Sequence, residues 1–300
     1  MFIDTHAHMD HVRFSSNRKE ILQDTKNLGV EKIINPAIDY ETNETMENVL
    51  KSYDWIYYAK GIHPNTVGVD DSADEAWQAG LIHMLSNNPD KRTVAIGETG
   101  IDFHRLTRSS QGGLDEEGAI TLRRQYKWFR KQMELAGAYE LPLVLHIRNA
   151  NVNYIRKTKG MSEDACLEYV DAHKAAMKVL AEFQDVLSLA EKGVVHCFTS
   201  NEIEDAKQYI QMGYLIGIGG AVTYEENEGL REIVKEIPLD RILLETDSPY
   251  VMPVGLPGKR NTPLNIPYIA KYVAELKGLQ VEEVEEVTTQ NAIRLFKLPV

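Results

Sequence analysis

Residues 2–11 read FIDTHAHMDH, a short apolar run that ends in two histidines one residue apart. In a β-strand successive side chains point to opposite faces, so Asp4, His6 and His8 would share one face. Two neutral imidazoles on one face are able to bind one divalent cation. Histidine pairs of this kind also occur as surface or core residues, so the rest of the chain has to decide between the two interpretations.

The same arrangement recurs along the chain, where further apolar runs of strand length end on polar residues. Segments with apolar residues at steps of three and four, such as residues 122–136, lie between most of these runs and indicate amphipathic helices. Eight strands that alternate with helices predict a (β/α)8 TIM barrel of the α/β class. After the first run at residues 2–6, the expected strands are residues 31–38, 55–62, 93–97, 141–147, 193–198, 214–220 and 241–247.

The length of 300 residues suits one barrel, so we expect a single domain over residues 1–300. Two stretches exceed what such a barrel needs. Residues 105–118 are polar and rich in glycine, which is typical of a surface loop. About 45 residues separate the fifth and sixth expected strands, more than a usual crossover, and we place a second insertion at residues 150–190. Within it, residues 151–160 are interpreted as an irregular loop and Ser162 as the cap of a helix.

Composition narrows the class of protein. No run approaches the roughly 18 apolar residues that a membrane span needs, and the chain opens without a basic leader, so we expect a cytoplasmic protein. Its two cysteines agree with a reducing compartment. A net charge of −12 argues against broad adhesion to nucleic acid. It does not exclude a nucleic-acid substrate, because bound metal ions would add positive charge locally.

In barrels of this type the chemistry lies at the carboxyl-terminal ends of the strands. Histidine and acidic residues fall at or just after the ends of six of the eight expected strands. A random scatter would seldom place them there. These residues are His6, His8, His63, Glu98, His146, His196 and Asp247.

The pattern predicts two divalent cations. His6, His8 and Asp247 come from the first and eighth strands, which become neighbours when a barrel closes, and would bind the first ion. The histidines of the fifth and sixth strands lie on the opposite wall and would bind the second. Glu98 has two carboxylate oxygens and is able to bridge ions about 4 Å apart. Nitrogen and oxygen donors without thiolate suit Zn, Mg, Mn or Fe alike.

The chemistry expected of such a site is metal-assisted hydrolysis. A metal-bound water loses a proton near neutral pH, and a carboxylate accepts that proton. We interpret Asp247 as this acceptor. The alternative for Asp247 is a plain ligand or a helix cap before Ser248 and Pro249.

At these residues the chain resembles the TatD-type metal-dependent deoxyribonucleases of the amidohydrolase superfamily. The resemblance extends in order from residue 2 to residue 263, and its blocks are specific together although each is weak alone. They read FIDTHAHMD, GIHPN, AIGETGIDF, LPLVLHIRNA, GVVHCFTS, YLIGIGG, ILLETDSPY and GKRNTP.

The resemblance implies hydrolysis of DNA phosphodiester bonds, on single strands or strand ends. It also implies metal binding by the same six ligands, His6, His8, Glu98, His146, His196 and Asp247, with His63 near the scissile phosphate. Glu98, Asp247 and His63 are thus the candidate catalytic residues. No membrane and no obligate protein partner is expected.

This chain departs from the family pattern at a few positions. The family often has Asp where Asn149 stands, Ser-Gly where Thr199 and Ser200 stand, and Glu where Thr262 stands. Together with the two insertions, these differences are expected to affect the choice of substrate more than the metal site.

Four residues are expected to contact the substrate. His63 follows the third strand at the barrel mouth. Arg148 lies two residues after His146 and should share its face, and Lys259 with Arg260 lies in the loop after the eighth strand. Cations of this kind are often only solvated, but near two metal ions they are the best phosphate ligands that this acidic chain offers.

The remaining histidines and acids receive weaker interpretations. Asp102 and His104 follow Glu98 closely and are expected to orient a ligand or to contact substrate. Asp4 is expected to orient His6 or to cap a turn. No role is assigned to His11, His83 and His173.

Three alternatives stay open. One is a small-molecule amidohydrolase or phosphoesterase on the same barrel; such barrels often bridge their metals with a modified lysine, and the glutamate at residue 98 favours the nuclease branch. Another is an aminoacyl-tRNA deacylase, which the residues do not separate from a deoxyribonuclease. The third is a metal-stabilised barrel without enzymatic activity, which would bind a partner through its insertions.

Overall fold

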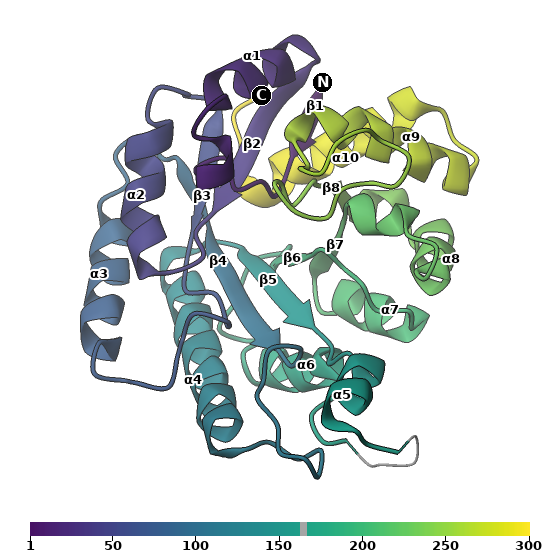
Figure 1. The fold of residues 1–300 in the computed structure, drawn as a ribbon. Coiled ribbons are helices and arrows are strands. Elements are labelled where there is room, and N and C mark those ends of the chain that lie inside the picture. Colours follow the sequence, from purple (N-terminus) through teal and green to yellow (C-terminus); the bar gives the residue numbers. More distant parts are fainter. Residues whose placement is uncertain (163–166) are drawn as a thin grey trace.

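The computed structural model describes residues 1–162 and 167–300 and shows an eight-stranded parallel sheet in the order β1 to β8. The strands curve around one axis, with helices on the outside (Figure 1). The predicted (β/α)8 barrel is therefore confirmed. Its strands are β1 (Phe2–Asp4), β2 (Val30–Pro36), β3 (Ile56–Lys60), β4 (Thr93–Asp102), β5 (Leu143–Arg148), β6 (Gly193–His196), β7 (Tyr214–Ile218) and β8 (Ile242–Leu244).

The barrel closes between β1 and β8 just beyond the ends of the two strands. The amide of Thr5 donates to the carbonyl of Leu244 at 3.1 Å, and Ala7 forms a parallel bridge with Ser248. These contacts bring the segment after β1 against the segment after β8. The two expected metal-binding segments are neighbours for this reason.

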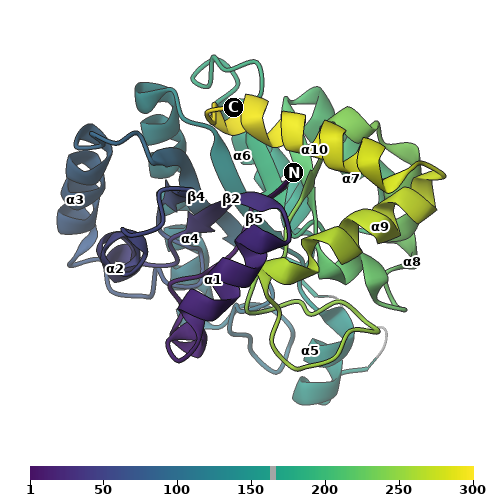
Figure 2. The same cartoon turned by 90° about the horizontal axis from the view of Figure 1, so that it is seen from above.

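Ten α-helices lie within the described residues and cover the outer face of the barrel. The last of them, α10, packs against β1 and β8, and it lies beside α9 (Figure 2). None of these helices is both long enough and apolar enough to cross a lipid bilayer. The helices are α1 (Arg18–Asn27), α2 (Tyr40–Leu50), α3 (Asp74–Ser86), α4 (Glu116–Tyr139), α5 (Val152–Lys159), α6 (Ala172–Glu182), α7 (Ile203–Gln211), α8 (Glu228–Glu236), α9 (Ile266–Lys277) and α10 (Val281–Phe296).

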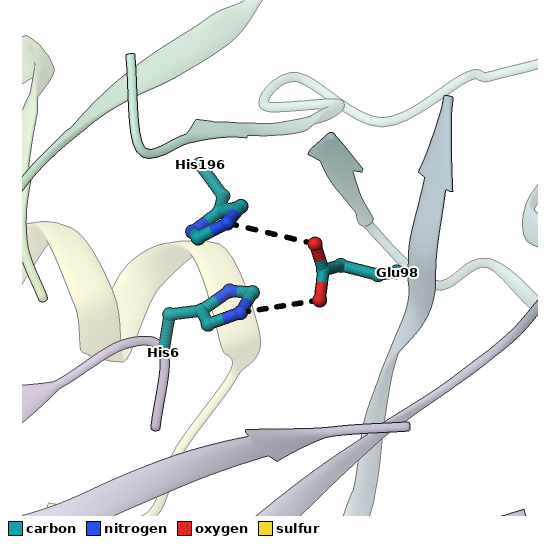
Figure 3. A group of neighbouring side chains, drawn as sticks. All are labelled: His6, Glu98 and His196. Carbon is teal, nitrogen blue, oxygen red and sulfur yellow. Dashed lines mark ion pairs between the residues drawn. The ribbon is translucent and has the colours of Figure 1, made fainter. Parts of the chain in front are cut away.

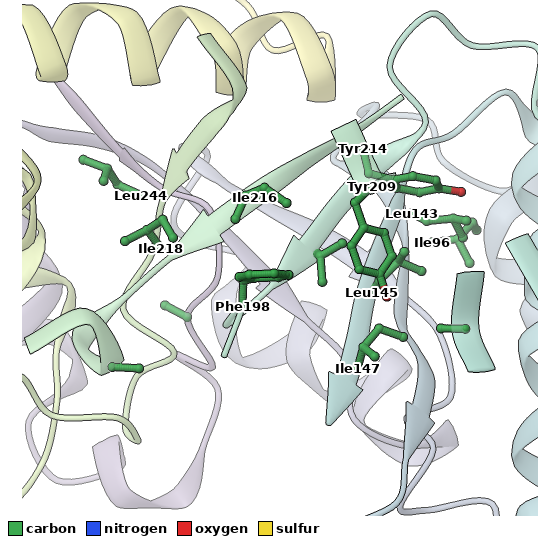
Figure 4. Close-up of a cluster of buried hydrophobic side chains, with 14 of the residues drawn as sticks. Ile96, Leu143, Leu145, Ile147, Phe198, Tyr209, Tyr214, Ile216, Ile218 and Leu244 are labelled. Atoms are coloured by element: carbon green, nitrogen blue, oxygen red, sulfur yellow. The ribbon is translucent and has the colours of Figure 1, made fainter. Parts of the chain in front are cut away.

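Alternation along the strands divides the apolar core in two. In β5, Leu143, Leu145 and Ile147 belong to the large cluster between barrel and helices, which Figure 4 shows in part. Val144 belongs to a second cluster, shared with the C-terminal end of α10. Because side chains alternate, His146 lies on the same face of β5 as Val144, toward the barrel interior.

The structure corrects two details of the expected elements. The stretch 151–160, interpreted above as an irregular loop, contains α5, whose first turn is capped by Asn151 through the amide of Tyr154 at 2.9 Å. The prediction of a helix capped by Ser162 runs into residues 163–166, which lie outside the described residues. In the described part, the next helix begins later, after Asp171 as its cap. Helix α8 was not anticipated.

The stretch 105–118 is mostly without helix or strand, as expected of a loop, until α4 begins at Glu116. The buried guanidinium of Arg108 donates to the carbonyls of Glu168 at 2.6 Å and Tyr169 at 2.8 Å. This contact ties the two predicted insertions to each other on the side of the barrel where β4 and β5 end.

Candidate metal centre

The carboxylate of Glu98 lies at the centre of a ring of histidines at the carboxyl-terminal ends of the strands. Oxygen Oε2 is 3.3 Å from Nε2 of His6 and 3.6 Å from Nε2 of His8. The other oxygen, Oε1, contacts a nitrogen of three more rings: His63 at 3.4 Å, His146 at 3.0 Å and His196 at 3.5 Å. Figure 3 shows His6 and His196 on either oxygen of Glu98.

Asp247 completes this cluster from the segment after β8. Its Oδ1 lies 3.5 Å from Nε2 of His8 and 3.8 Å from Nε2 of His6. The structure therefore brings all six expected ligands together, with His63 beside them. Donor atoms within 4.8 Å of one another form three groups: His6, Glu98 and His196; His6, His8 and Asp247; and His63, Glu98 and His146.

The grouping of the histidines differs from the expected one. The sequence suggested that the histidines of β5 and β6 would act together. In the structure the ring of His196 stacks on that of His6, with centroids 3.4 Å apart, while His146 lies 4.2 Å from His63. The rings of His146 and His196 are 6.1 Å apart. Which ligand binds which ion therefore stays a prediction.

Hydrogen bonds at the far nitrogen of His8 and of His196 fix which nitrogen of these rings faces the centre. Nδ1 of His8 lies 3.2 Å from the carbonyl oxygen of Pro36. A carbonyl only accepts, so Nδ1 donates to it and Nε2 is the nitrogen left for a cation. Nδ1 of His196 lies 3.1 Å from Glu245, which likewise leaves its Nε2 for the centre.

The ring of His63 is oriented in the opposite sense. Its Nδ1 accepts the amide N–H of Asn65 at 3.0 Å, so this nitrogen carries no proton. Burial and the neighbouring His146 lower the pKa of His63, which keeps the ring neutral. The single ring proton then lies on Nε2, which faces Glu98. This tautomer makes His63 a hydrogen-bond donor to the centre rather than a metal ligand.

Asp102 holds His146 from behind. Its Oδ2 lies 3.1 Å from Nε2 of His146 and accepts from the side chain of Asn65 at 2.8 Å. Asp102 belongs to β4, which continues past Glu98, and its other oxygen accepts the amides of His104 and Arg105. The expectation that Asp102 orients a neighbouring ligand thus agrees with its contacts.

The segments after β1 and β8 position the remaining ligands through the backbone. The amide of Asp247 donates to the carbonyl of His6 at 2.8 Å, and the amide of His8 donates to Ser248 at 2.8 Å. Strand β1 ends at Asp4, so alternation along a strand is not what directs His6 and His8. The carboxylate of Asp4 accepts the amide of His6 and binds Thr246, and thereby fixes this turn.

Several ionisable side chains lie close together in this cluster. Burial opposes ionisation of Glu98, yet the surrounding histidines hold its pKa well below the usual range. Burial also opposes protonation of His8, but Asp247 and Glu98 outweigh it and raise the pKa of His8 to about 9. For His146, Asp102 and Glu98 outweigh burial in the same way and raise the pKa to about 9.

The donor set fits a divalent cation. Nε2 of His6 and Nε2 of His8 are 3.2 Å apart, and both face carboxylate oxygens. The other nitrogen of His6, Nδ1, is buried and has no hydrogen-bond partner in the described part of the chain. Imidazole nitrogens converging with carboxylates are the ligands that Zn and related ions prefer.

The three expected phosphate-binding cations have different surroundings. Arg148 is exposed at the end of β5, and Lys259 is exposed in the loop after β8. Arg260 instead donates to the carbonyl of Arg13 and to the side chain of Asn17, and its guanidinium lies 4.7 Å from the ring of Phe14. These contacts hold Arg260 away from the cluster.

Sequence reasoning missed Glu245 and Tyr250. Glu245 is buried and binds both the ring of His196 and the amide of Cys197. Its place two residues before Asp247 in the strand expected at residues 241–247 was the signal that would have found it, although β8 itself ends at Leu244. Tyr250 lies edge-on to His8, with centroids 6.1 Å apart, and its sequence context carries no comparable signal.

Comparisons with known proteins agree with this picture. The sequence family described as TatD related DNase matches residues 3–297. The chain is 32% identical to the uncharacterized metal-dependent hydrolase YabD of Bacillus subtilis, over 99% of this chain and 100% of that protein. It is 29% identical to the 3'-5' ssDNA/RNA exonuclease TatD of Erwinia billingiae, over 99% of both. The solved structure of the TatD homolog YjjV from Escherichia coli K12 superposes with a TM-score of 0.78 at 28% identity, covering 99% of this chain and 98% of the other.

Proposed function

Because this chain belongs to the TatD related DNase family of metal-dependent hydrolases, we propose that it hydrolyses phosphodiester bonds of DNA, in single strands or at strand ends. The observation that carries the proposal is the position of Glu98, which contacts five imidazoles at the mouth of the barrel. The name of the Erwinia relative supports a single-stranded substrate.

We assign two divalent cations, Zn, Mg or Mn, to this cluster. The residues that would hold them are His6, His8, Glu98, His146, His196 and Asp247, and Glu98 belongs to two of the three groups of donors. When bound, such ions polarise a phosphate ester and acidify a bound water.

The residues themselves supply the proton transfer and the contacts to the phosphate. Burial opposes ionisation of Asp247, but its hydrogen bond to His8 and the adjacent histidines lower its pKa, so it stays ionised and able to accept a proton. His63 presents an N–H toward the centre and would donate to a phosphate oxygen. Arg148 and Lys259 offer exposed cations at the rim, where they would bind phosphates of the strand. Arg260 would act only after leaving its contacts with Arg13 and Asn17.

The test compares chelated protein with protein reloaded with Mn, Mg or Zn. Each form is assayed on labelled single-stranded DNA, on duplex DNA, on RNA of the same sequence and on a generic phosphodiester. We expect metal to restore cleavage of single-stranded DNA. Glu98→Gln, loaded under the same conditions, is the matched negative control.

The outcomes separate the alternatives. Restored cleavage of the generic ester without any nucleic acid would overturn the DNA assignment and favour a small-molecule phosphoesterase. A chain that binds metal but cleaves no substrate would instead agree with a non-enzymatic barrel.

A further inference from the structure

An aromatic pair stands at the rim of the barrel mouth, outside the ligand cluster. The ring of Tyr154, on α5, stacks on that of His104 just after β4, with centroids 6.2 Å apart and planes 28° apart. Tyr154 is 59% exposed, one of the largest exposures of an aromatic side chain in the described residues. Its ring therefore presents a flat apolar surface to solvent that the fold does not use.

Short contacts connect this pair to the cluster. One oxygen of Asp102 accepts the amide of His104 at 2.7 Å, and the other lies 3.1 Å from the ring of His146. Helix α5 begins four residues after Arg148, where β5 ends (Figure 1). The pair thus flanks the centre on the side of β4 and β5.

A cation stands on the same side of the barrel mouth. Arg148 lies opposite Asp102 in the ladder between β4 and β5, and burial together with the charge of Arg148 lowers the pKa of His104. Its side chain is exposed and takes part in no ion pair among residues 1–162 and 167–300. An aromatic face beside an exposed guanidinium matches a nucleotide, whose base stacks and whose phosphate is anionic.

Contacts between side chains and backbone connect the segments that flank the pair. Arg108 fastens the loop before α4 to the carbonyls of Glu168 and Tyr169. The ring of Tyr169 in turn packs edge-on against Phe103, with centroids 6.0 Å apart. Helix α5 carries Arg156, Lys157 and Lys159 and no acidic residue, in a chain whose net charge is −12.

We propose that the rim where β4 and β5 end forms a base-stacking subsite, in which Tyr154 and His104 stack a base next to the scissile phosphate while Arg148 binds the adjoining phosphate. This subsite rests on the proposed action on nucleic acid and would select an unpaired strand, because a base is free to stack on protein only when it is unpaired.

The other end of the barrel offers a matched control. Trp55 precedes β3, at the amino-terminal end, and Nζ of Lys26 lies 5.2 Å from its ring centroid. This pair also places an aromatic ring beside a cation, but Trp55 is half-buried, stands away from the ligand cluster, and Lys26 is paired with Glu31. It should contribute nothing to strand binding.

The experiment measures affinity of the metal-loaded protein for a fluorescent single-stranded oligonucleotide with cleavage-resistant phosphorothioate linkages. A second oligonucleotide carries abasic residues in place of the nucleotides. Tyr154→Ala is expected to weaken binding of the normal strand about tenfold. Tyr154→Phe should bind like the parent, because it keeps the ring, and so should Trp55→Ala. On the abasic strand the loss caused by Tyr154→Ala should disappear, because no base is left to stack.

Three results would overturn the subsite. Equal binding of the normal strand by Tyr154→Ala and the parent, with unchanged melting temperature, would remove the stacking role while leaving the proposed function intact. An equal loss on normal and abasic strands would show that the ring acts other than by stacking. Failure of the parent to bind or cleave any nucleic acid would remove the proposed function, and the subsite with it.

Discussion

Histidines lie in two regions of this molecule, and two rings of the first region differ from the one in the second. At the barrel mouth, the buried His8 and the half-buried His146 lie against carboxylates, which raise the pKa of each ring to about 9. Behind the barrel wall, His173 of α6 is 1% exposed and lies between Phe198 and Tyr209. There burial outweighs the more distant charges of Asp205 and Asp171 and lowers the pKa of His173 to about 4.

The difference shows what identifies a site. Burial alone produces a neutral imidazole, as in His173, whose Nδ1 lies 3.3 Å from the hydroxyl of Tyr209. A carboxylate behind the ring, at the nitrogen that points away from the centre, fixes the orientation of the ring. A carboxylate in front of it, at the centre, adds a negative charge that several rings contact. The mouth has both, since Asp102 and Glu245 lie behind His146 and His196 while Glu98 lies in front. That double support is the property that a cation site requires.

Removing the carboxylate of Glu98 from the centre should have the largest effect on activity. Glu98→Gln is expected to lower kcat/KM on single-stranded DNA by about three orders of magnitude, because it weakens every group of donors that converges on the centre. Metal content by mass spectrometry should fall in parallel. Full activity and full metal content in this variant would contradict the assignment of Glu98.

Chelation should lower the stability of the whole barrel. An ion present at 100 times its dissociation constant stabilises the folded state by about 2.7 kcal/mol, which corresponds to roughly 5 °C in melting temperature. The expected result is a loss of this size on adding chelator and its recovery on adding Mn or Zn. Glu98→Gln serves as the control, and a melting temperature as sensitive to chelator as the parent's would place the ions elsewhere.

Removing a carboxylate from behind a ring should have a smaller effect. Asp102→Asn and Glu245→Gln are each expected to weaken metal binding by about 10- to 100-fold, because both rings keep their nitrogens but lose the partner that orients them. Metal titration followed by calorimetry measures this. Asp240→Asn, an exposed carboxylate away from the mouth, is the control. If both variants bound metal as tightly as the parent, Asp102 and Glu245 would not orient metal ligands.

His173 should affect only the dependence of stability on pH. Its pKa is about 4 in the folded state and near 6.5 when unfolded, so the unfolded chain binds more protons between these values. Stability should therefore fall as pH is lowered through this window, by about 1 kcal/mol from pH 6.5 to pH 5.5. Denaturant unfolding of His173→Gln should show a flatter profile by this amount. A profile as steep as the parent's would assign the effect to other groups.

The sequence predicted the barrel and the members of the cluster because both follow from local patterns. Apolar runs of strand length gave the eight strands, and the residue at the end of each run gave His63, Glu98, His146 and His196. Chain closure then placed Asp247 near the first two histidines. These inferences need only the knowledge that strand ends meet at one edge.

The features that the sequence did not predict depend mostly on contacts between residues far apart in the chain. The stacking of His196 on His6 follows from the curvature of the closed barrel, which no run of residues encodes. Arg260 is engaged by Arg13 and Asn17, nearly 250 positions away. Helix α5 is missed because it is only eight residues long and carries few apolar residues, of which only Ile155 is buried.

The most direct test of the account is anomalous diffraction from crystals soaked in Mn or Zn. We predict anomalous peaks within coordination distance of Glu98, with one of them also touching His6, His8 and Asp247. Peaks only at distant surface residues, with Glu98 contacting no ion in fully loaded crystals, would contradict the central claim that these strand ends form a metal centre.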